Sequence, residues 1–308
     1  RMFDATRLLQ TLTDALSLGS LYALIAIGYT MVYGVLRLIN FAHGEIFMIA
    51  MYIVFYGISM FSLPWYVTFA VTILVTALLG TLAERLAYRP LRNAPRISIL
   101  ISAIGVSYFL QNLATVLFGG RPLTFPQIPL FTDVLVIGDV YFQRLSLIVP
   151  VIAAALLFLL LLLIRHTKTG LAMRAVSRDY DAASLMGIDL NRTIAITFFI
   201  GSALAGVGAI MWGMKYTRIS PTIGAMPGIK CFIAAVLGGI GNIRGSIISA
   251  TLLTILPELL RAFANYRMLI YAIVLILVML ATNNPTLRSL VQRIIPHKKG
   301  QKKEADEA

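Results

Sequence analysis

Charged residues are scarce in this chain. Of its 308 residues, 59% are hydrophobic and only 13% are charged, whereas soluble globular domains carry about 25% charged residues. The mean hydropathy is +0.86. This composition excludes a soluble globular fold, and we expect lipid to be the solvent for most of the chain.

Cysteine and acidic residues are also rare. Cys231 is the only cysteine, which excludes an intrachain disulfide and argues against a structural zinc cluster. The 26 Lys and Arg outnumber the 13 Asp and Glu, giving a net charge of +13. Basic residues between apolar runs usually obey the positive-inside rule or contact anionic headgroups. We therefore expect contact with membrane lipid and no nucleic-acid partner.

A nucleotide-binding loop is missing as well. No stretch of the Gly-x4-Gly-Lys-Ser/Thr kind occurs in the sequence, so the chain is not expected to bind and hydrolyse ATP in that way. Nor is a nucleophile paired with a base recognisable. We expect no enzyme activity, no bound metal and no cofactor, so that any ATP would be hydrolysed by partner subunits. We also expect no cleavable signal peptide, because the first apolar run is long enough to span a membrane.

Long uncharged runs are what the sequence has in quantity. About 20 apolar residues are needed to cross the hydrocarbon core as a helix. One run is twice too long for a single helix, and Pro64 and Trp65 offer a natural break in it. The predicted helices cover about 15–36, 41–58, 66–83, 97–118, 146–164, 193–213, 227–240, 245–260 and 268–284. We predict an all-α integral membrane protein, a bundle of about nine (8–10) transmembrane helices.

Basic residues at the span ends give this bundle a direction. With nine spans, Lys and Arg fall on one side about twice as often as on the other, and that side is expected to be the cytoplasm. The N-terminus is then outside and the C-terminus cytoplasmic. We expect residues 1–290 to form a single transmembrane domain with a long cytoplasmic segment at about 165–191. The tail 291–308, rich in both basic and acidic residues, is expected to be disordered.

Polar residues interrupt the apolar runs near residue 40. Asn40, His43 and Glu45 would be costly beside lipid unless they are hydrogen-bonded or face a polar cavity, so they are candidates for a translocation path or gate. A simpler interpretation is a helix cap at the cytoplasmic interface. In that case Asn40 accepts from the next turn and Glu45 complements the helix dipole. The spacing of His43 and Glu45 does not suggest a paired metal site.

Small residues gather in two other runs. Gly238, Gly239 and Gly241 lie between two short apolar segments, where they allow close helix approach or a broken helix that lines a cavity. We add them to the candidates for the translocation path or gate. A stripe of small residues on another helix, at positions 201, 205 and 209, predicts close helix packing.

The cytoplasmic segment 165–191 is neither apolar enough to span nor polar enough to be a plain linker. Its apolar residues at helical spacing, Ala175, Tyr180, Ala183, Leu185 and Met186, predict a short helix. One interpretation is an element that docks on a partner. The other is an interfacial helix lying on the membrane, favoured by nearby arginines.

Several of these runs resemble one family. The run Leu18–Gly34, continuing into Ile39–Glu45, is its most specific motif, and further matches lie at 87–92, 100–105, 182–189 and 234–241. The chain resembles the inner-membrane permease of high-affinity branched-chain amino acid ABC transporters, the LivH type, over about residues 12–280. It departs from the family pattern at Thr282–Arg288, where Arg-Pro-x-Gly-Leu is common.

The resemblance implies an assembly and a substrate. Such permeases lie in the bacterial cytoplasmic (inner) membrane as multi-pass proteins. They pair with a second, homologous permease and two cytoplasmic ATP-binding subunits, and an extracytoplasmic solute-binding protein delivers Leu, Ile or Val. The cytoplasmic segment would then hold a coupling helix that seats in an ATPase groove. The implied ATPase-coupling residues are Gly170, Arg174, Ala175, Asp179, Ala182, Ala183 and Gly187.

Two alternatives stay open at this point. The same machine could carry another small solute, such as an amide, urea, a sugar or a nucleoside. A different class is an ion-coupled secondary transporter, in which His43, Glu45, Lys230 and Glu258 would form a proton relay.

Overall fold

The computed structural model describes residues 5–36, 40–92, 94–137, 140–239 and 243–259, together with four helical residues, Leu269, Ala272, Ile273 and Ile276. Two compact units divide the chain at residue 261, and the second runs from 262 to 308. The predicted tail 291–308 and most of the predicted last helix, 268–284, lie outside the described residues. The fold and the candidate site belong to the first unit.

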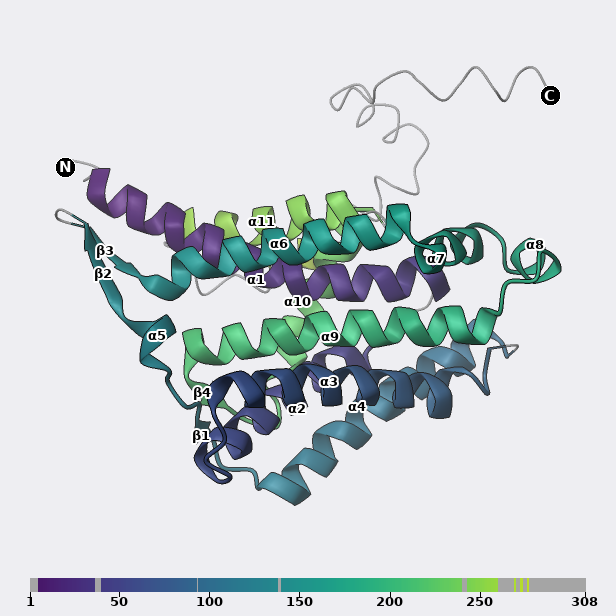
Figure 1. The fold of residues 1–308 in the computed structure, drawn as a ribbon, viewed down its shortest axis with the longest axis horizontal. Coiled ribbons are helices and arrows are strands. Elements are labelled where there is room, and N and C mark those ends of the chain that lie inside the picture. Colours follow the sequence, from purple (N-terminus) through teal and green to yellow (C-terminus); the bar gives the residue numbers. More distant parts are fainter. Residues whose placement is uncertain are drawn as a thin grey trace, which may run out of the picture. The chain divides into compact units, whose positions relative to one another are not determined.

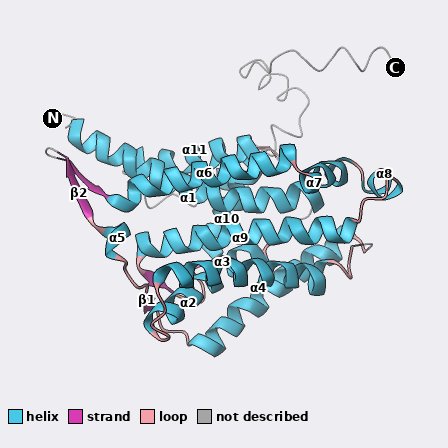
Figure 2. Ribbon diagram, in the orientation of Figure 1, coloured by secondary structure: helices cyan, strands magenta, loops and turns pink. Residues whose placement is uncertain are grey.

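Helices make up most of the first unit (Figures 1 and 2). They are α1 (Ala5–Leu36), α2 (Ala42–Ser59), α3 (Trp65–Ala83), the π-helix η1 (Glu84–Tyr88), α4 (Arg96–Phe118), α5 (Pro129–Thr132), α6 (Arg144–His166), α7 (Lys168–Arg178), α8 (Tyr180–Leu185), α9 (Leu190–Tyr216), α10 (Ala225–Leu237) and α11 (Ile243–Leu259). Six stretches, in α1, α2, α3 with η1, α4, α6 and α9, are long and apolar enough to cross a membrane. The helical membrane fold is thus confirmed, while the count of nine spans stays a prediction.

Prolines set two of the helix starts. Pro64 precedes α3 and Pro95 precedes α4, because proline tolerates the first turn of a helix but interrupts the ladder further in. The predicted break before Trp65 is therefore confirmed. The Trp65 ring lies edge-on to Phe69 and Phe131, with both centroid distances 5.6 Å, so this turn is anchored to the segment that contains α5.

Short strands occur in the segments that join the long helices. β1 (Leu123–Thr124) pairs with β4 (Arg218–Ile219), and β2 (Val134–Ile137) pairs with β3 (Val140–Gln143), both antiparallel. The sequence predicted only helices, because alternation over two to four residues is too brief to recognise. The small β1–β4 sheet ties the segment after α4 to the segment after α9.

Three helices form the centre of the unit. α9 packs against α1 and α2, and the outer helices α3 and α6 pack on α9 and α1 (Figure 1). The helices differ in the share of buried residues in an apolar 18-residue stretch. This share is 83% in α1 and 67% in α2 and α9, but only 28%, 17% and 11% in α3, α4 and α6. The outer helices therefore leave apolar faces for lipid, which matches the continuous hydrophobicity of their sequences.

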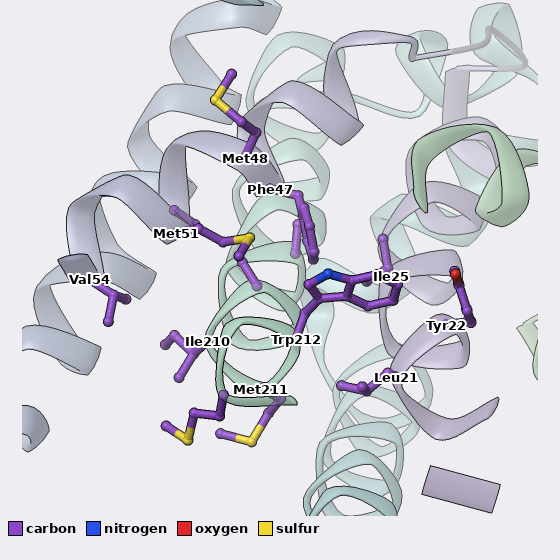
Figure 3. Close-up of a cluster of buried hydrophobic side chains, with 14 of the residues drawn as sticks. Leu21, Tyr22, Ile25, Phe47, Met48, Met51, Val54, Ile210, Met211 and Trp212 are labelled. Atoms are coloured by element: carbon purple, nitrogen blue, oxygen red, sulfur yellow. The ribbon is translucent and has the colours of Figure 1, made fainter. Parts of the chain in front are cut away.

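An aromatic contact joins the central helices. Trp212 on α9 meets the Tyr22 ring of α1 edge-on at 5.3 Å and the Phe47 ring of α2 at 5.9 Å. Figure 3 shows the indole of Trp212 between Phe47 and Ile25, inside a buried cluster that also contains Met48 and Met51. Edge-to-face ring pairs add about 0.5–1.5 kcal/mol to the burial of their area.

Threonines line the buried face of α3. The hydroxyls of Thr68, Thr72 and Thr76 each donate to the carbonyl four residues earlier, at 3.2, 2.7 and 2.5 Å. All three residues are buried, and α3 packs along α9. Each hydroxyl is thus satisfied within its own helix, which removes the penalty for burying it.

Candidate functional site

A cavity of about 200 Å³ lies where α1, α2, α4 and α10 meet. Residues of α2 and the turn before it form one wall, and the first half of α10 forms the other. The lining residues are Tyr29, Asn40, Phe41, Gly44, Glu45, Ser107, Gly224, Ala225, Gly228, Ile229 and Phe232. Aromatic and apolar side chains thus surround a small number of polar groups, as in most small-molecule sites.

Two helix starts meet at this cavity through glycine. A Cβ atom on Gly44, in the first turn of α2, would lie 2.5 Å from the carbonyl oxygen of Gly224, at the start of α10. A Cβ on Gly228 would lie 3.4 Å from Gly44 Cα. Only glycine lets the two backbones approach this closely. The backbones of the two first turns therefore pack directly against each other beside the cavity.

The start of α2 lies deep within the bundle. His43 packs beside Gly28, where an added Cβ would be 3.1 Å from the histidine ring and 2.5 Å from Gly201 O. At 1.5 Å per residue, Gly28 is about 12 Å from the Leu36 end of α1, and Gly201 is about 16 Å from the Leu190 end of α9. The first turn of α2 therefore lies beside interior turns of α1 and α9, well inside the ends of these two helices.

Glu45 is the acidic group of the cavity. Its side chain is 3% exposed, and Oε1 accepts a hydrogen bond from Ser107 Oγ on α4 at 3.4 Å. Within the described part of the chain, Oε2 has no hydrogen-bond partner. Glu45 also makes no ion pair with any basic side chain there within 4.0 Å. This carboxyl group is therefore buried beside a cavity with half of its bonding capacity unused.

Asn40 supplies a polar donor at the same cavity. Its Oδ1 accepts a hydrogen bond from Tyr88 Oη of η1 at 2.8 Å, whereas Nδ2 finds no partner among the described residues. Asn40 does not cap α2: the N-cap residue is Phe41, which makes no side-chain capping bond. The simpler interpretation of Asn40 as a helix cap is therefore wrong.

Aromatic rings enclose the polar groups. The Phe232 ring lies 6.0 Å from the Tyr29 ring and 6.4 Å from the Phe41 ring. On its other side, Tyr29 meets the buried His43 edge-on at 5.8 Å. His43 thus packs behind Tyr29 and supports the wall of the cavity instead of lining it. Phe41 and Ile229 are 36% and 48% exposed, so the cavity opens beside them.

The segment after α6 folds into two helices instead of the single one predicted. Thr167 Oγ1 caps α7 by accepting from Gly170 N at 3.0 Å, and Asp179 Oδ1 caps α8 by accepting from Ala182 N at 3.0 Å. Asp179 itself is extended, with φ −152°, which ends α7. The capping preference of aspartate explains the break, and the aspartate could have indicated it in the sequence.

This segment, α7 with α8, is fixed to the bundle at a few points. Tyr180 Oη donates to Val35 O at the end of α1 at 2.6 Å, and Ala183 is buried. A Cβ on Gly170 would collide with the carbonyls of residues 163 and 164. Gly187 follows α8 with φ +81°, a conformation that side chains other than glycine disfavour. Arg174 and Ala182 are exposed, and Ala175 is half-buried.

The tip of α8 is apolar and uncovered. Leu185 and the next residue, Met186, are 88% and 83% exposed, more than any other large hydrophobic side chains among the described residues. Their helix ends at the turn formed by Gly187, which holds the tip away from the bundle (Figure 1). Such an exposed apolar pair indicates a contact surface.

A buried ion pair connects this end of the bundle to the cavity. Arg92 donates to Glu84 Oε1 of η1 at 2.8 Å and to Asn191 Oδ1, at the start of α9, at 2.7 Å. Glu84 is 1% exposed. The same π-helix carries Tyr88, which holds Asn40 at the cavity. Single π-turns often mark functional sites, and here one links α9 to the start of α2.

Removing the acid of this pair should destabilise the bundle. We expect Glu84→Ala to lower the free energy of unfolding by on the order of 3 kcal/mol, because it leaves a largely buried guanidinium without its counter-charge. The melting temperature in detergent should fall by several degrees. Asp133→Ala is the matched control, since Asp133 is 52% exposed and lies 3.5 Å from Arg144. An equal loss in both variants would contradict the importance of burial.

Comparison with known proteins places the chain in a family. The family model described as the branched-chain amino acid transport system, permease component, matches residues 11–279. The chain belongs to this permease family. The permease BraD of Pseudomonas aeruginosa is 43% identical over 258 residues, covering 80% of this chain and 83% of the relative. The permeases named LivH of Escherichia coli K12 and Salmonella typhimurium are 40% and 39% identical over 287 residues, covering 88% and 92%. Both names describe high-affinity branched-chain amino acid transport systems. No solved structure matches the chain.

The permease brings only part of the predicted path residues together. Asn40 and Glu45 line the cavity, and His43 lies behind it. Gly238 and Gly239 lie at the opposite end of α10, where a Cβ on Gly238 would collide with the backbone of residues 245 and 246. Gly241 is outside the described residues. Gly238 therefore packs against the first turns of α11, and the place of these glycines in a path stays a prediction.

Other cavity residues of the permease were not predicted. Ser107 is one hydroxyl in a long apolar run, and nothing local distinguishes it. Gly224 and Gly228 recur after four residues, the spacing of one helix face, and this repeat was an available signal. Tyr29 and Phe232 lie in apolar runs of predicted membrane helices, where the sequence gives no sign that they line a cavity. Among the described residues, no group of three His, Cys, Asp or Glu side chains comes together to hold a metal.

Proposed function

We propose that this chain is the membrane-spanning permease subunit of an ATP-binding-cassette importer for branched-chain amino acids. The similarity to BraD and LivH over at least 80% of the chain carries this proposal. The absence of a Gly-x4-Gly-Lys-Ser/Thr loop supports a division of labour in which partner subunits hydrolyse ATP. The chain itself then needs no cofactor and performs no catalysis.

The partners follow from that machine. A second homologous permease completes the membrane part, two cytoplasmic ATP-binding subunits drive it, and an extracytoplasmic solute-binding protein delivers Leu, Ile or Val. We place residues 1–290 in one transmembrane domain of about nine helices, with the tail 291–308 in the cytoplasm. The N-terminus lies outside the bacterial cytoplasmic (inner) membrane. The exposed mouth of the cavity beside Ile229 supports a path between the two permeases.

The segment of α7 and α8 serves as the coupling element in this proposal. Its fixed turns at Gly170, Asp179 and Gly187 support motion as a rigid unit. The exposed pair Leu185 and Met186 supports a seat in an apolar groove of an ATPase. Closure of the ATPases would then move α9. This motion would pass from Asn191 on α9 to Arg92 and η1, and from there to Asn40 at the cavity.

Vesicle transport tests this function. The permease, its two ATPases and its second permease are reconstituted into proteoliposomes, with loaded binding protein outside and ATP inside. Leucine should accumulate only when ATP and the binding protein are both present. Uptake driven by an ion gradient without the ATPases would instead support a secondary transporter. Competition by unlabelled isoleucine and valine, but not by urea or ribose, would separate the proposed substrates from other small solutes.

A further inference from the structure

Three lining residues of the cavity carry a buried polar atom without a hydrogen-bond partner among the described residues, and these atoms are Glu45 Oε2, Asn40 Nδ2 and Tyr29 Oη. Buried polar groups are nearly always bonded, so each such exception calls for an explanation. In a membrane helix a carboxyl group of this kind marks a functional site, because its burial is costly.

A free amino acid offers the complementary groups. Its ammonium group is positively charged and can donate a hydrogen bond to the unpaired oxygen of Glu45. Hydrogen bonds between charged groups are stronger than those between neutral groups. Its carboxylate accepts hydrogen bonds, which Asn40 Nδ2 can donate. Sugars and amides have donors and acceptors but no ammonium group. Asn40 Nδ2 and Tyr29 Oη could bond to either kind of solute, whereas the unpaired carboxyl oxygen of Glu45 favours a ligand with an ammonium group over the neutral solutes.

The helix starts add a second site for the carboxylate. Neither α2 nor α10 has a side-chain cap on its first turn. Gly44 in the first turn of α2 and Gly224 at the N-cap of α10 both line the cavity. The start of a helix carries partial positive charge and free N–H groups, which favour an anion. Interrupted helices that begin near the middle of the bilayer use this property to bind substrate carboxylates.

The remaining walls suit an apolar side chain. Phe41, Ile229 and Phe232 line the cavity on the side where it opens. They provide carbon surface without further buried hydrogen-bonding groups, and a cavity of about 200 Å³ limits the ligand to a small molecule. A short branched aliphatic group gains from such contact in proportion to the area it buries.

We propose that this cavity binds the zwitterionic amino acid itself during translocation, with Glu45 pairing the ammonium group. Asn40 and the first turns of α2 and α10 hold the carboxylate, and Phe41, Ile229 and Phe232 receive the side chain. The permease would thus recognise the ammonium and carboxylate groups of the substrate itself, and this recognition would add to the selection made by the binding protein. This inference rests on the proposed function and names the site at which it acts.

Thermal stabilisation tests the site without transport. The purified transporter in nanodiscs is melted with and without an excess of leucine, in the absence of binding protein and ATP. A ligand that binds only the native state raises the melting temperature. Leucine should stabilise the wild type, and isocaproate, which is leucine without its ammonium group, should not. Equal shifts with both ligands, or no shift with leucine, would overturn the proposal.

Glu45→Gln tests the charge, because it keeps the size of the side chain. This variant should lose the leucine-dependent shift and transport leucine at least tenfold more slowly in proteoliposomes. Glu45→Asp, which keeps the charge, should recover part of both. Asn112→Ala, which removes an exposed side chain on α4 that bonds only to Tyr108 O of the same helix, should stay within about threefold of the wild type. A Glu45→Gln protein with the wild-type shift and rate would contradict the ammonium pairing.

The two hypotheses fail in different ways. If the wild-type transporter takes up no branched-chain amino acid with ATP and binding protein present, the proposed function is wrong. If it takes up leucine and Glu45→Gln does so equally well, the importer stands and the role of Glu45 is wrong. A general loss of stability in Glu45→Gln appears in the ligand-free melting curve, where the charge-retaining Glu45→Asp serves as the reference.

Discussion

Gly44→Val should reduce ATP-driven leucine uptake to less than a tenth of the wild-type rate. A side chain at Gly44 starts with a Cβ 2.5 Å from Gly224 O, so α2 and α10 must move apart. Overpacking of this kind costs about 1–3 kcal/mol, and it separates the two helix starts at the cavity. Uptake in proteoliposomes measures the effect on function, and melting in detergent measures the effect on the free energy of unfolding.

A glycine with open surroundings provides the control for this substitution. A Cβ on Gly105 meets nothing within 4 Å, and this residue of α4 is exposed. Gly105→Val should therefore keep both the melting temperature and the uptake rate near the wild-type values. Gly224→Val should resemble Gly44→Val, because it blocks the same contact from the other side. Normal transport by Gly44→Val would show that the working protein does not need this close approach.

Leu185→Asp should separate the permease from its ATPases. Leu185 is 88% exposed, so a charge there is solvated in the isolated subunit and should leave insertion and melting unchanged. In an apolar groove the same carboxylate would be desolvated without a partner, which costs several kcal/mol. We expect at least a tenfold loss of ATP-driven uptake and little ATPase retained on purification. Met60→Asp, at a 69% exposed apolar residue on the loop before α3, should retain the ATPases.

Two further substitutions examine the same coupling element. Gly187→Val strains a backbone with φ +81° and should move the α8 tip. Arg174→Glu reverses the charge of an exposed residue of α7. Both should weaken stimulation of ATP hydrolysis by the loaded binding protein. Normal stimulation in these variants and in Leu185→Asp would exclude α7 and α8 as the coupling element.

The long helices were predictable because each satisfies a local requirement. An apolar run of membrane length forms a helix wherever lipid replaces water, since the backbone has no other partner there. The break before Trp65 followed from Pro64 in the same local way. Asn40 and Glu45 could also be identified, because polar groups within apolar runs are conspicuous.

The shape of the cavity could not be predicted from local pattern. Ser107 reaches Glu45 across 62 positions, and Tyr88 reaches Asn40 across 48. Such pairings depend on how α2, α4, η1 and α10 pack. A hydrophobic run predicts that a helix forms, but it does not predict which other helices will contact it. The division of the coupling element into two helices could have been predicted. Asp179 is a favourable N-cap residue, but the prediction of a single helix used only the spacing of the apolar residues.

The threonine row on α3 has a mechanical consequence. Because Thr68, Thr72 and Thr76 bond to carbonyls of their own helix, none of these hydroxyls fastens α3 to α9. Contact across this seam is instead non-directional, between the row and small residues such as Gly206, which faces Thr76. Van der Waals contacts re-form after a small shift, whereas a directional bond would have to break. The threonine row therefore adds no directional bond to the seam between α3 and α9, which is instead fastened beyond its η1 end, where Arg92 donates to Asn191 of α9.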